Sequence, residues 1–282
     1  DSGRKARQPY LWNTDFCFGD WLLPSVMKQP GAVPMDSAAK TAELMASAYY
    51  ANTIWLMEKV ASVLKEQEDA AYYHDLHEKI RAAFMAEYVR PDGTLTHEFQ
   101  GAYVVSLKFH LVPRKLRAQS ARRLCELIAQ NDDCLDTGFL SVHLLLDVLA
   151  ETGHADVAYK LLFQTKCPGW LYMIEHGATT IWEMWDCIGS DGSIGAYSYN
   201  HYAFGCVGKW FYTRLAGIVA QAPGYRKVRI RPGHDSGLTH VRATVETPYG
   251  PLTVAWEILS GTLRVETVIP KEIDARLSLP GR

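Results

Sequence analysis

The hydrophobic and polar positions of residues 36–218 follow a mostly helical pattern. After Asp36 and Ser37, either of which could cap a helix, apolar side chains recur every three or four residues up to Leu64. The same period predicts further helices separated by turns such as Pro91-Asp92-Gly93. We place these helices at about residues 70–88, 99–109, 113–130, 138–151, 155–164 and 202–218. No stretch indicates a strand–helix–strand unit, so this part of the chain is predicted to be a helical domain.

The pattern changes near Pro223-Gly224, where an alternation with a period of two replaces the helical period. Val228 and Ile230 alternate with charged residues, and residues 241–258 continue the alternation. Ser260-Gly261 then predicts a hairpin between two strands. We therefore expect two domains, a helical one over residues 1–223 and a small antiparallel β domain over residues 224–282. The helices come roughly in pairs without a fixed sequence repeat, which favours a closed barrel of helical hairpins over an open solenoid.

Composition and charge narrow the class of protein. The chain has 282 residues, of which 48% are hydrophobic, and its formal net charge is −2, so we expect a globular protein with a sizeable core. No basic stripe stands out, and no apolar run approaches the roughly 18 residues of a membrane span. We accordingly expect neither nucleic acid nor a membrane as a partner.

The cysteines and histidines show no metal-ligand spacing. The six cysteines are scattered without a C-x-x-C pair, which favours free thiols in a reducing compartment, and hence a cytoplasmic location, over disulfides. His74 and His77 are three residues apart and have no third partner nearby. Gly-rich phosphate loops and a G-x-S-x-G elbow are also absent from the sequence. We expect no metal and no cofactor.

The densest group of chemically informative residues lies at positions 177–186, which read GATTIWEMWD. Here Glu183 follows Trp182 directly and precedes Trp185 by two positions. Indole rings exclude water from a carboxylate, and their flat faces suit stacking on the C–H face of a sugar. The alternative is a helix N-terminus, with one of the preceding threonines as the cap and Glu183 in the first turn.

Three other groups lie at similar junctions between loops and predicted helices. Asp20 and Trp21 share an aromatic loop, where they could instead cap a turn and fill the core. His201 begins the last predicted helix and is either a ligand contact or a structural histidine. Residues 136–139 (DTGF) are either part of a site or an N-cap. In a barrel of hairpins such helix starts converge at one end, where a pair of carboxyl groups could hydrolyse a glycosidic bond.

Taken together, these motifs resemble those of the bacterial α-L-rhamnosidases, the inverting hydrolases of glycoside hydrolase family 78. The resemblance runs in order along nearly the whole chain, including the entry to the C-terminal domain. The matching segments are residues 18–22 (FGDWL), 136–139 (DTGF), 177–186 (GATTIWEMWD), 200–205 (NHYAFG), 215–218 (LAGI), 223–225 (PGY) and 247–250 (TPYG).

The resemblance implies a mainly α fold with an appended β domain, namely part of an (α/α)6 helical-hairpin barrel over residues 1–223 and a small antiparallel β-sandwich over residues 224–282. It implies that Glu183 is the general base that activates the attacking water. The residues that it assigns to the rhamnose pocket are Asp20, Trp21, Trp182, Trp185 and His201. Which of the two tryptophans beside Glu183 faces the sugar is left open. The implied substrate is a rhamnose-containing glycoside.

One departure from the family pattern concerns the general acid. In the family this glutamate lies well upstream of the Gly-Asp-Trp loop, whereas this sequence starts about twenty residues before that loop. The seven or eight helices expected here are also fewer than the twelve of the family fold. We therefore interpret the sequence as the C-terminal part of such an enzyme, with little activity alone. Uncovered helix faces would favour a homo-oligomer or pairing with the missing N-terminal part.

Three alternatives remain. A non-catalytic carbohydrate-binding protein on the same scaffold would keep Trp21, Trp182 and His201 without needing a base. A hydrolase or phosphorylase for another sugar would share the barrel, since a fold does not fix a substrate. A structural helical scaffold would have no site. Replacing Glu183 by glutamine separates the first alternative from an enzyme, because only the enzyme would lose turnover while it keeps binding.

Overall fold

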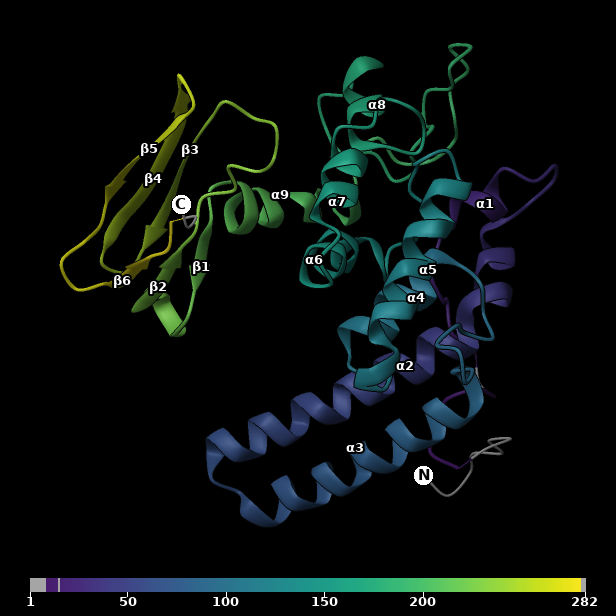
Figure 1. Cartoon of the computed structure of the whole chain (residues 1–282). Coiled ribbons are helices and arrows are strands. Elements are labelled where there is room, and N and C mark those ends of the chain that lie inside the picture. Colours follow the sequence, from purple (N-terminus) through teal and green to yellow (C-terminus); the bar gives the residue numbers. More distant parts are fainter. Residues whose placement is uncertain (1–8, 15, 280–282) are drawn as a thin grey trace. The chain divides into compact units, whose positions relative to one another are not determined.

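The computed structural model describes residues 9–14 and 16–279. The chain divides into two compact units, Asp1–Phe204 and Gly205–Arg282. The first unit is built from helices and the second mostly from strands (Figure 1). This confirms the predicted fold class, in which helices come first and strands follow. The domain boundary expected at residues 223 and 224 stays a prediction.

Helical hairpins make up most of the first unit. The helices are α1 (Pro24–Met27), α2 (Pro34–Leu64), α3 (Gln67–Tyr88), α4 (Gln100–Lys108), α5 (Arg117–Gln130), α6 (Val142–Glu151), α7 (Ala155–Leu162) and α8 (Trp170–Glu175). The long helices α2 and α3 lie side by side as one hairpin (Figure 1). Helices α4 and α5 form a second hairpin, and α6 and α7 form a third.

The ends of α2 follow from its sequence. Pro34 is the first helical residue, where its missing N–H costs no hydrogen bond. Two residues later, Asp36 accepts the backbone N–H of Val33 at 2.9 Å. The helix ends at Lys65, which adopts a left-handed conformation with φ = 66°. Asp36 therefore does contribute to the start of this helix, from its third position rather than from the cap itself.

Helix α4 forms the centre of the helical unit. The side chains from Gln100 to Leu107 are all buried, so this helix is covered on every side. Its neighbours include α2, α5 and α6. A helix that is buried all round is expected to be apolar on all faces, and five of these eight positions carry Ala, Tyr, Val or Leu.

The structure differs from the predicted helices at three places. Between α8 and residue 203 the chain is irregular, with one isolated bridge between Ile188 and Ile194, so no helix begins at Glu183 and the capping interpretation of that motif is wrong. Helix α6 begins at Val142 rather than near residue 138. Helices α1 and α8 were not expected from the pattern because each has only one or two turns.

The helix expected at residues 202–218 is shorter and changes its winding. It passes from a 3-10 turn through α9 (Val207–Trp210) to a π-helical turn at Phe211–Leu215. Gly217 then adopts φ = +79°, and a Cβ there would collide with the carbonyl oxygen of Arg231. The glycine therefore lets the chain leave the helix and enter a strand beside residue 231.

The second unit contains two three-stranded sheets. Their strands are β1 (Ile218–Ala220), β2 (Lys227–Ile230), β3 (His240–Thr247), β4 (Gly250–Leu259), β5 (Thr262–Val268) and β6 (Asp274–Leu277). The order in one sheet is β3-β4-β5, with antiparallel neighbours throughout. In the other sheet, β1-β2-β6, the β2–β6 pair is parallel. The alternation in the sequence therefore predicted most of the strands. It did not predict that β6 runs parallel to β2.

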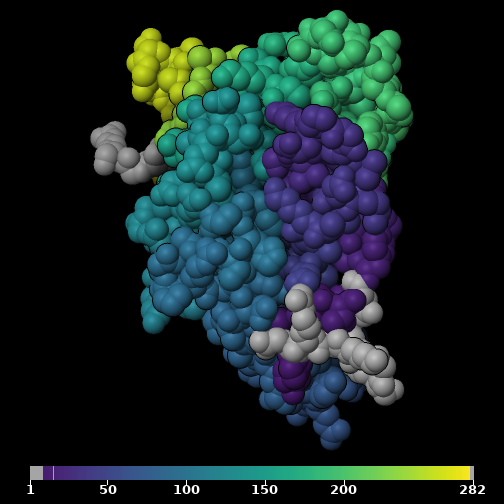
Figure 2. Space-filling model, turned by 90° about the vertical axis from the view of Figure 1, so that its right-hand side faces the viewer, coloured from purple at the N-terminus to yellow at the C-terminus, as the bar shows by residue number. Residues whose placement is uncertain are grey.

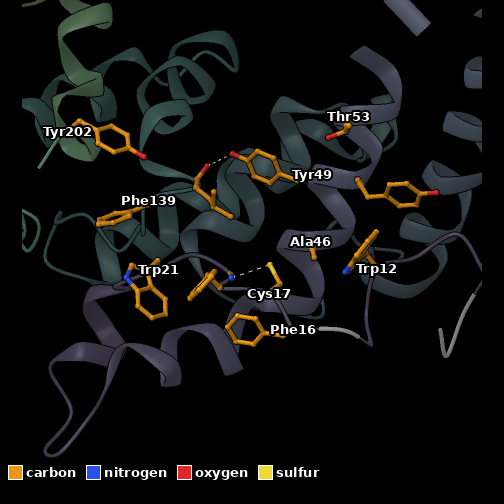
Figure 3. Close-up of a pocket in the computed structure, with 13 residues that line it drawn as sticks. Trp12, Phe16, Cys17, Trp21, Ala46, Tyr49, Thr53, Phe139 and Tyr202 are labelled. Carbon is orange, nitrogen blue, oxygen red and sulfur yellow. Dashed lines mark hydrogen bonds between the residues drawn. The ribbon is translucent and has the colours of Figure 1, made fainter. Parts of the chain in front are cut away.

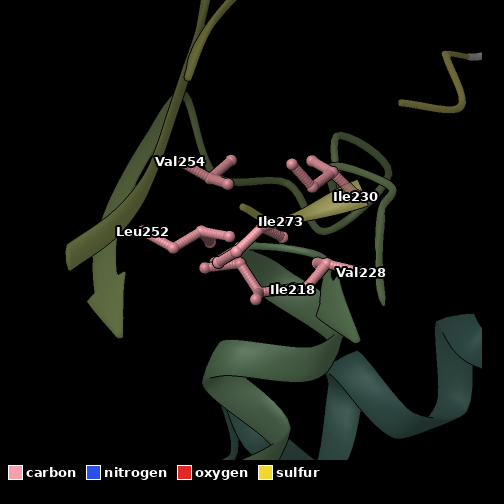
Figure 4. Packing of buried hydrophobic residues seen from close by; sticks show 7 residues of the cluster. Ile218, Val228, Ile230, Leu252, Val254 and Ile273 are labelled. Carbon is pink, nitrogen blue, oxygen red and sulfur yellow. The ribbon is translucent and has the colours of Figure 1, made fainter. Parts of the chain in front are cut away.

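Apolar side chains from both sheets form one core between them. Ile218, Val228 and Ile230 project from the first sheet toward Leu252 and Val254 of the second (Figure 4). These are the inward positions of the period-two pattern, whereas Lys227 and Arg229 point to solvent. The alternation in the sequence therefore sets which face of each sheet is buried.

Candidate active site

An aromatic pocket of about 840 Å³ lies in the helical unit. Its walls come from the loop before α1, from α2, and from the segments before α6 and α9 (Figure 3). Aromatic rings supply most of the lining surface, as is typical of pockets that stack on flat or C–H-rich ligands. The lining residues are Trp12, Phe16, Cys17, Phe18, Gly19, Trp21, Ala46, Tyr49, Tyr50, Thr53, Phe139, Leu140 and Tyr202.

Helix α2 supplies one wall through residues on a single face. Ala46, Tyr49, Tyr50 and Thr53 are spaced by three or four positions, so their side chains share one side of the helix. The Tyr49 hydroxyl donates to the carbonyl oxygen of Leu140 at 2.5 Å (Figure 3). This bond connects the helix to the facing wall of the pocket.

The loop that carries Asp20 and Trp21 forms the opposite wall, but the two side chains point to different environments. Trp21 lines the pocket, with the ring of Phe18 edge-on at 5.1 Å between centroids. Asp20 lies behind this wall and is 0% exposed. Its Oδ1 accepts the backbone N–H groups of Leu140 and Ser141, each at 3.0 Å, and the Ser141 hydroxyl binds Oδ2.

The buried environment determines the acidity of Asp20. Burial raises the pKa of Asp20 to about 6, and the hydrogen bonds from Ser141 and Leu140 oppose that rise. Burial and the charge of Asp20 together raise the pKa of the Tyr49 phenol, so Tyr49 stays neutral. Tyr49 in the pocket wall and Asp20 behind that wall are thus coupled electrostatically in a dry environment.

His201 borders the pocket through its aromatic neighbours. Its ring stacks on Phe139 with centroids 4.9 Å apart and on Tyr202 at 5.0 Å, and both of these partners line the pocket. The Nδ1 atom of His201 accepts the backbone N–H of Ala203 at 3.3 Å. With Nδ1 as the acceptor, Nε2 carries the ring N–H.

The segment that carries Glu183 pairs with the segment that carries His201 through backbone hydrogen bonds. His201 donates its backbone N–H to Ile181 at 2.8 Å, and Glu183 donates its own to Ser198 at 2.9 Å. The Ser198 N–H in turn binds Oε2 of Glu183 at 3.0 Å. Glu183 is half-buried. The backbone segments 181–183 and 198–201 are therefore fixed against each other.

The two tryptophans beside Glu183 are packed in the interior. Trp182 is 2% exposed and meets Tyr199 edge-on, whereas Trp185 is 3% exposed and stacks on Phe204 at 3.9 Å between centroids. Trp170 meets Trp185 edge-on, with ring centroids 5.4 Å apart. These indoles anchor the irregular segment that carries Glu183, which has no helix or sheet of its own to hold it.

Only some of the site residues predicted from the sequence lie at this pocket. Trp21 and the neighbours of His201 line the pocket, whereas Glu183 does not line it and belongs to a segment that pairs with the segment of His201. Tyr49 lines the pocket too, although the sequence pattern gave no sign of it, because on α2 a tyrosine is indistinguishable from any other apolar position. Trp12 also lines it, as one of the aromatic residues interleaved in the N-terminal loop. Within residues 9–14 and 16–279, no group of three or more His, Cys, Asp or Glu side chains is placed to hold a metal ion.

Both units match family models of one enzyme class. Residues 1–215 match the bacterial alpha-L-rhamnosidase 6 hairpin glycosidase domain. Residues 217–282 match the bacterial alpha-L-rhamnosidase C-terminal domain. The chain belongs to the bacterial α-L-rhamnosidases. The resemblance seen in the sequence motifs is thereby confirmed for the family and for the hairpin fold.

Relatives of known sequence agree with this family. An alpha-L-rhamnosidase of Streptomyces avermitilis is 41% identical over 266 residues, which are 93% of this chain and 24% of the relative. One from Formosa agariphila is 36% identical over 93% of this chain and 28% of its own length. The chain therefore spans about a quarter of the length of these relatives.

Solved rhamnosidase structures have the same fold. The Streptomyces avermitilis enzyme complexed with L-rhamnose superimposes with a TM-score of 0.86 at 40% identity, over 97% of this chain and 25% of that one. The Aspergillus terreus enzyme gives a TM-score of 0.90 at 31% identity, over 98% and 32%. Among the described helices of this rhamnosidase chain, none is both long and apolar enough to cross a membrane.

Proposed function

We propose that this chain takes part in the inverting hydrolysis of terminal α-L-rhamnosides, with release of L-rhamnose. It would supply the general base, Glu183, and part of the sugar pocket. The general acid would come from the part of the barrel that precedes these residues in longer relatives. The observation that carries the proposal is the backbone pairing of the Glu183 segment with the segment of His201, whose ring stacks on two lining residues of the aromatic pocket.

The contacts of Glu183 suit a base that activates water. Oε2 is held by the Ser198 N–H, which fixes the orientation of the carboxylate. The lone pairs of Oε1 remain suited to accept a proton from water. An inverting mechanism needs the acid on the other side of the scissile bond, about 6.5–9.5 Å from the base, so that one water fits between.

The pocket would bind the sugar chiefly through apolar contacts. The ring faces of Trp21 and Tyr202 offer flat surfaces for the C–H groups of a rhamnose unit, whose methyl group makes it more apolar than most hexoses. His201 would add a hydrogen bond. Trp182 and Trp185 would affect sugar binding through the packing that fixes the Glu183 segment.

The first test is an assay of the isolated chain on an aryl α-L-rhamnoside. We expect little or no turnover, because general acid catalysis alone contributes about 10²–10⁴-fold. Brisk turnover by the isolated chain would mean that the acid is among these 282 residues, and the division of roles would be wrong.

Replacing Glu183 by glutamine tests the assigned base. In a rhamnosidase chain that also carries the general acid, we expect Glu183→Gln to lower kcat by about 10²–10⁴-fold and to change rhamnose binding little, because the amide keeps the shape but cannot take a proton. Steady-state kinetics and calorimetry measure the two effects. Glu175→Gln, an exposed carboxylate on α8, is the matched control and should leave both unchanged.

A carbohydrate-binding protein without catalysis is the second candidate function, and the aromatic pocket favours it. In that case Glu183→Gln would leave binding intact and there would be no turnover to lose, even in the longer chain. Rhamnose binding together with an inactive longer chain would decide for this candidate.

An exposed apolar surface on α2 bears on the partner of this chain. Seen along the helix, the face that lines the pocket continues beyond Thr53 as an exposed stripe. We define the α2 stripe as Leu56, Met57, Val60, Val63 and Leu64. Its residues extend the alternating three- and four-residue spacing of the pocket wall, which is the spacing for packing along a second helix. Because the relatives are about four times longer, the occupant we propose is a helix of the rhamnosidase barrel outside these 282 residues.

The location proposed for the protein is the cytoplasm. This rests on the scattered spacing of the six cysteines, which lacks any C-x-x-C pair. Cell fractionation tests it, and recovery of the protein from the culture medium would contradict it.

A further inference from the structure

Two carboxylates connect the pocket walls in a reciprocal way. Asp20, in the loop before α1, accepts the backbone N–H groups of Leu140 and Ser141 in the segment before α6. Asp136, in that second segment, accepts the backbone N–H of Ser25 at 2.7 Å, at the start of α1. Each loop thus donates to a carboxylate of the other, and we call this pair of contacts the clasp.

The clasp lies directly behind residues that face the pocket. Trp21 follows Asp20 in the chain, and its carbonyl oxygen accepts the N–H of Phe139 at 3.2 Å. The rings of Trp21 and Phe139 both line the pocket (Figure 3). On the surface shown in Figure 2, the purple residues of the N-terminal part lie next to green residues from around position 200, so segments that are distant in the sequence meet on this face.

Close packing leaves Asp20 little freedom to reach the pocket. Its backbone N–H donates to the buried Thr41 hydroxyl of α2 at 2.7 Å. On another side, Gly101 of α4 sits so near that a Cβ there would collide with Oδ2. Both carboxylate oxygens already accept bonds from Leu140 and Ser141, and the side chain is 0% exposed. A sugar in the pocket would not reach this carboxylate without displacing the wall.

We infer that Asp20 and Asp136 are positioning residues, which hold Trp21 and Phe139 in place for sugar binding and do not themselves contact the sugar. This inference rests on the proposed rhamnose site. A carboxylate is suited to the role because charged acceptors bind backbone N–H groups more strongly than neutral ones do. The clasp therefore acts on the ligand only through the rings it positions.

The state of charge of Asp20 gives the clasp a measurable signature. The titratable neighbours are Tyr49 on α2, which stays neutral, and Asp136 on the same segment as Leu140; α4 contributes Gly101, which carries no charge. Since burial raises the pKa of Asp20 to about 6, protonation below that pH removes the charge-assisted part of its bonds. The Trp21 indole should report this event, because it follows Asp20 directly.

The test follows the ¹H–¹⁵N resonance of the Trp21 indole between pH 4 and pH 8 in the sugar-free chain, assigned with Trp21→Phe. We expect a transition near pH 6 that is absent in Asp20→Asn. In Ser141→Ala the transition should move to higher pH, because the lost hydroxyl donor favours the charged carboxylate. Asp92→Asn is the matched control: Asp92 also accepts a backbone N–H, from Thr94 at 2.9 Å, but in a turn that lines no part of the pocket.

Calorimetric binding of L-rhamnose then separates positioning from contact. If Asp20 positions the wall, the affinity of the unaltered chain should fall severalfold more than that of Asp20→Asn as the pH drops from 7 to 5, because the asparagine removes only the contribution of Asp20. The proposed positioning role of the clasp would be overturned if the Trp21 resonance did not change with pH. The same transition in Asp20→Asn would also overturn it. Weaker binding in Asp20→Asn with an unmoved Trp21 resonance would instead show a direct sugar contact. Absence of rhamnose binding would count against the proposed function alone, since the resonance tests the clasp without sugar.

Discussion

At the scale of single residues, the space around two helical glycines shows how closely the chain packs behind the pocket wall. Gly101 of α4 faces Asp20 and Ser141, and a Cβ there would lie 2.7 Å from the Ser141 hydroxyl oxygen. Gly208 of α9 has nothing within 4 Å of the same position. Both glycines are helical, so helix propensity alone would favour alanine at each site by up to about 1 kcal/mol.

The two glycines should therefore respond oppositely to alanine. We expect Gly101→Ala to lower the free energy of unfolding by about 1–3 kcal/mol, because overpacking forces Asp20 away from its partners. Gly208→Ala should be neutral or raise it slightly. Urea unfolding followed by circular dichroism measures both. Equal effects at the two positions would show that the contact around Asp20 is loose.

The buried carboxylate of Asp20 predicts a pH dependence of stability whose sign is unusual for an aspartate. Its pKa is about 6 in the folded chain and near 3.8 otherwise, so the folded chain holds the extra proton between these values. Stability from this group is therefore greatest at low pH and falls as the pH rises from about 4 to about 6, by about 3 kcal/mol. Most aspartates, which have lowered pKa values when folded, act in the other direction.

Other groups also titrate between pH 4 and pH 7, so the effect of Asp20 is measured as the difference in free energy of unfolding between the unaltered chain and Asp20→Asn. The free energy of unfolding of the unaltered chain minus that of Asp20→Asn should decrease by about 3 kcal/mol between pH 4 and pH 7 and stay constant above pH 7. Urea titrations at each pH provide it. A difference that is flat, or that increases with pH, would contradict the raised pKa of the buried Asp20 carboxyl.

At the scale of elements, α2 has two different environments along one face. Its middle part, from Ala46 to Thr53, lines the pocket, whereas its C-terminal part exposes the α2 stripe, in which Leu56 is 47% and Val63 is 81% exposed. An apolar stripe with this spacing is typical of a helix that packs against another helix. The sequence alone shows the spacing, and only the structure shows that α3 does not cover it.

Substituting the stripe should have opposite consequences in the two contexts. In the isolated chain we expect Leu56→Glu to change the free energy of unfolding by less than about 0.5 kcal/mol and to reduce any self-association. In a rhamnosidase with the whole barrel it should lower stability by several kcal/mol, because the charge would be buried. Ala71→Glu, exposed on α3, is the control for both. Equal effects of Leu56→Glu in the two chains would argue for a second copy of this chain, or no occupant, on the stripe.

At the scale of the whole molecule, the periodicity of the sequence determined the elements and their order. The helical period located α2 to α7 within a few residues, and the period of two located β2 to β5, because one buried face per element imposes these patterns. The motifs around Trp21, Glu183 and His201 were sufficient for the family. Local patterns did not locate α1 and α8, since one or two turns carry too few periods to register.

What only the tertiary structure decided is which side chains meet. The sequence motifs suggested that Trp182, Trp185 and Asp20 face the pocket, but in the folded chain all three are buried. Trp182 contacts Tyr199, Trp185 contacts Phe204, and Asp20 is hydrogen-bonded to Ser141. Tyr49 looked like an ordinary core position and lines the pocket. A sequence pattern predicts which face of a helix is buried, because side chains three or four positions apart lie on the same face. Contacts such as Asp20 with Ser141 join residues more than a hundred positions apart, so they exist only once the hairpins have packed.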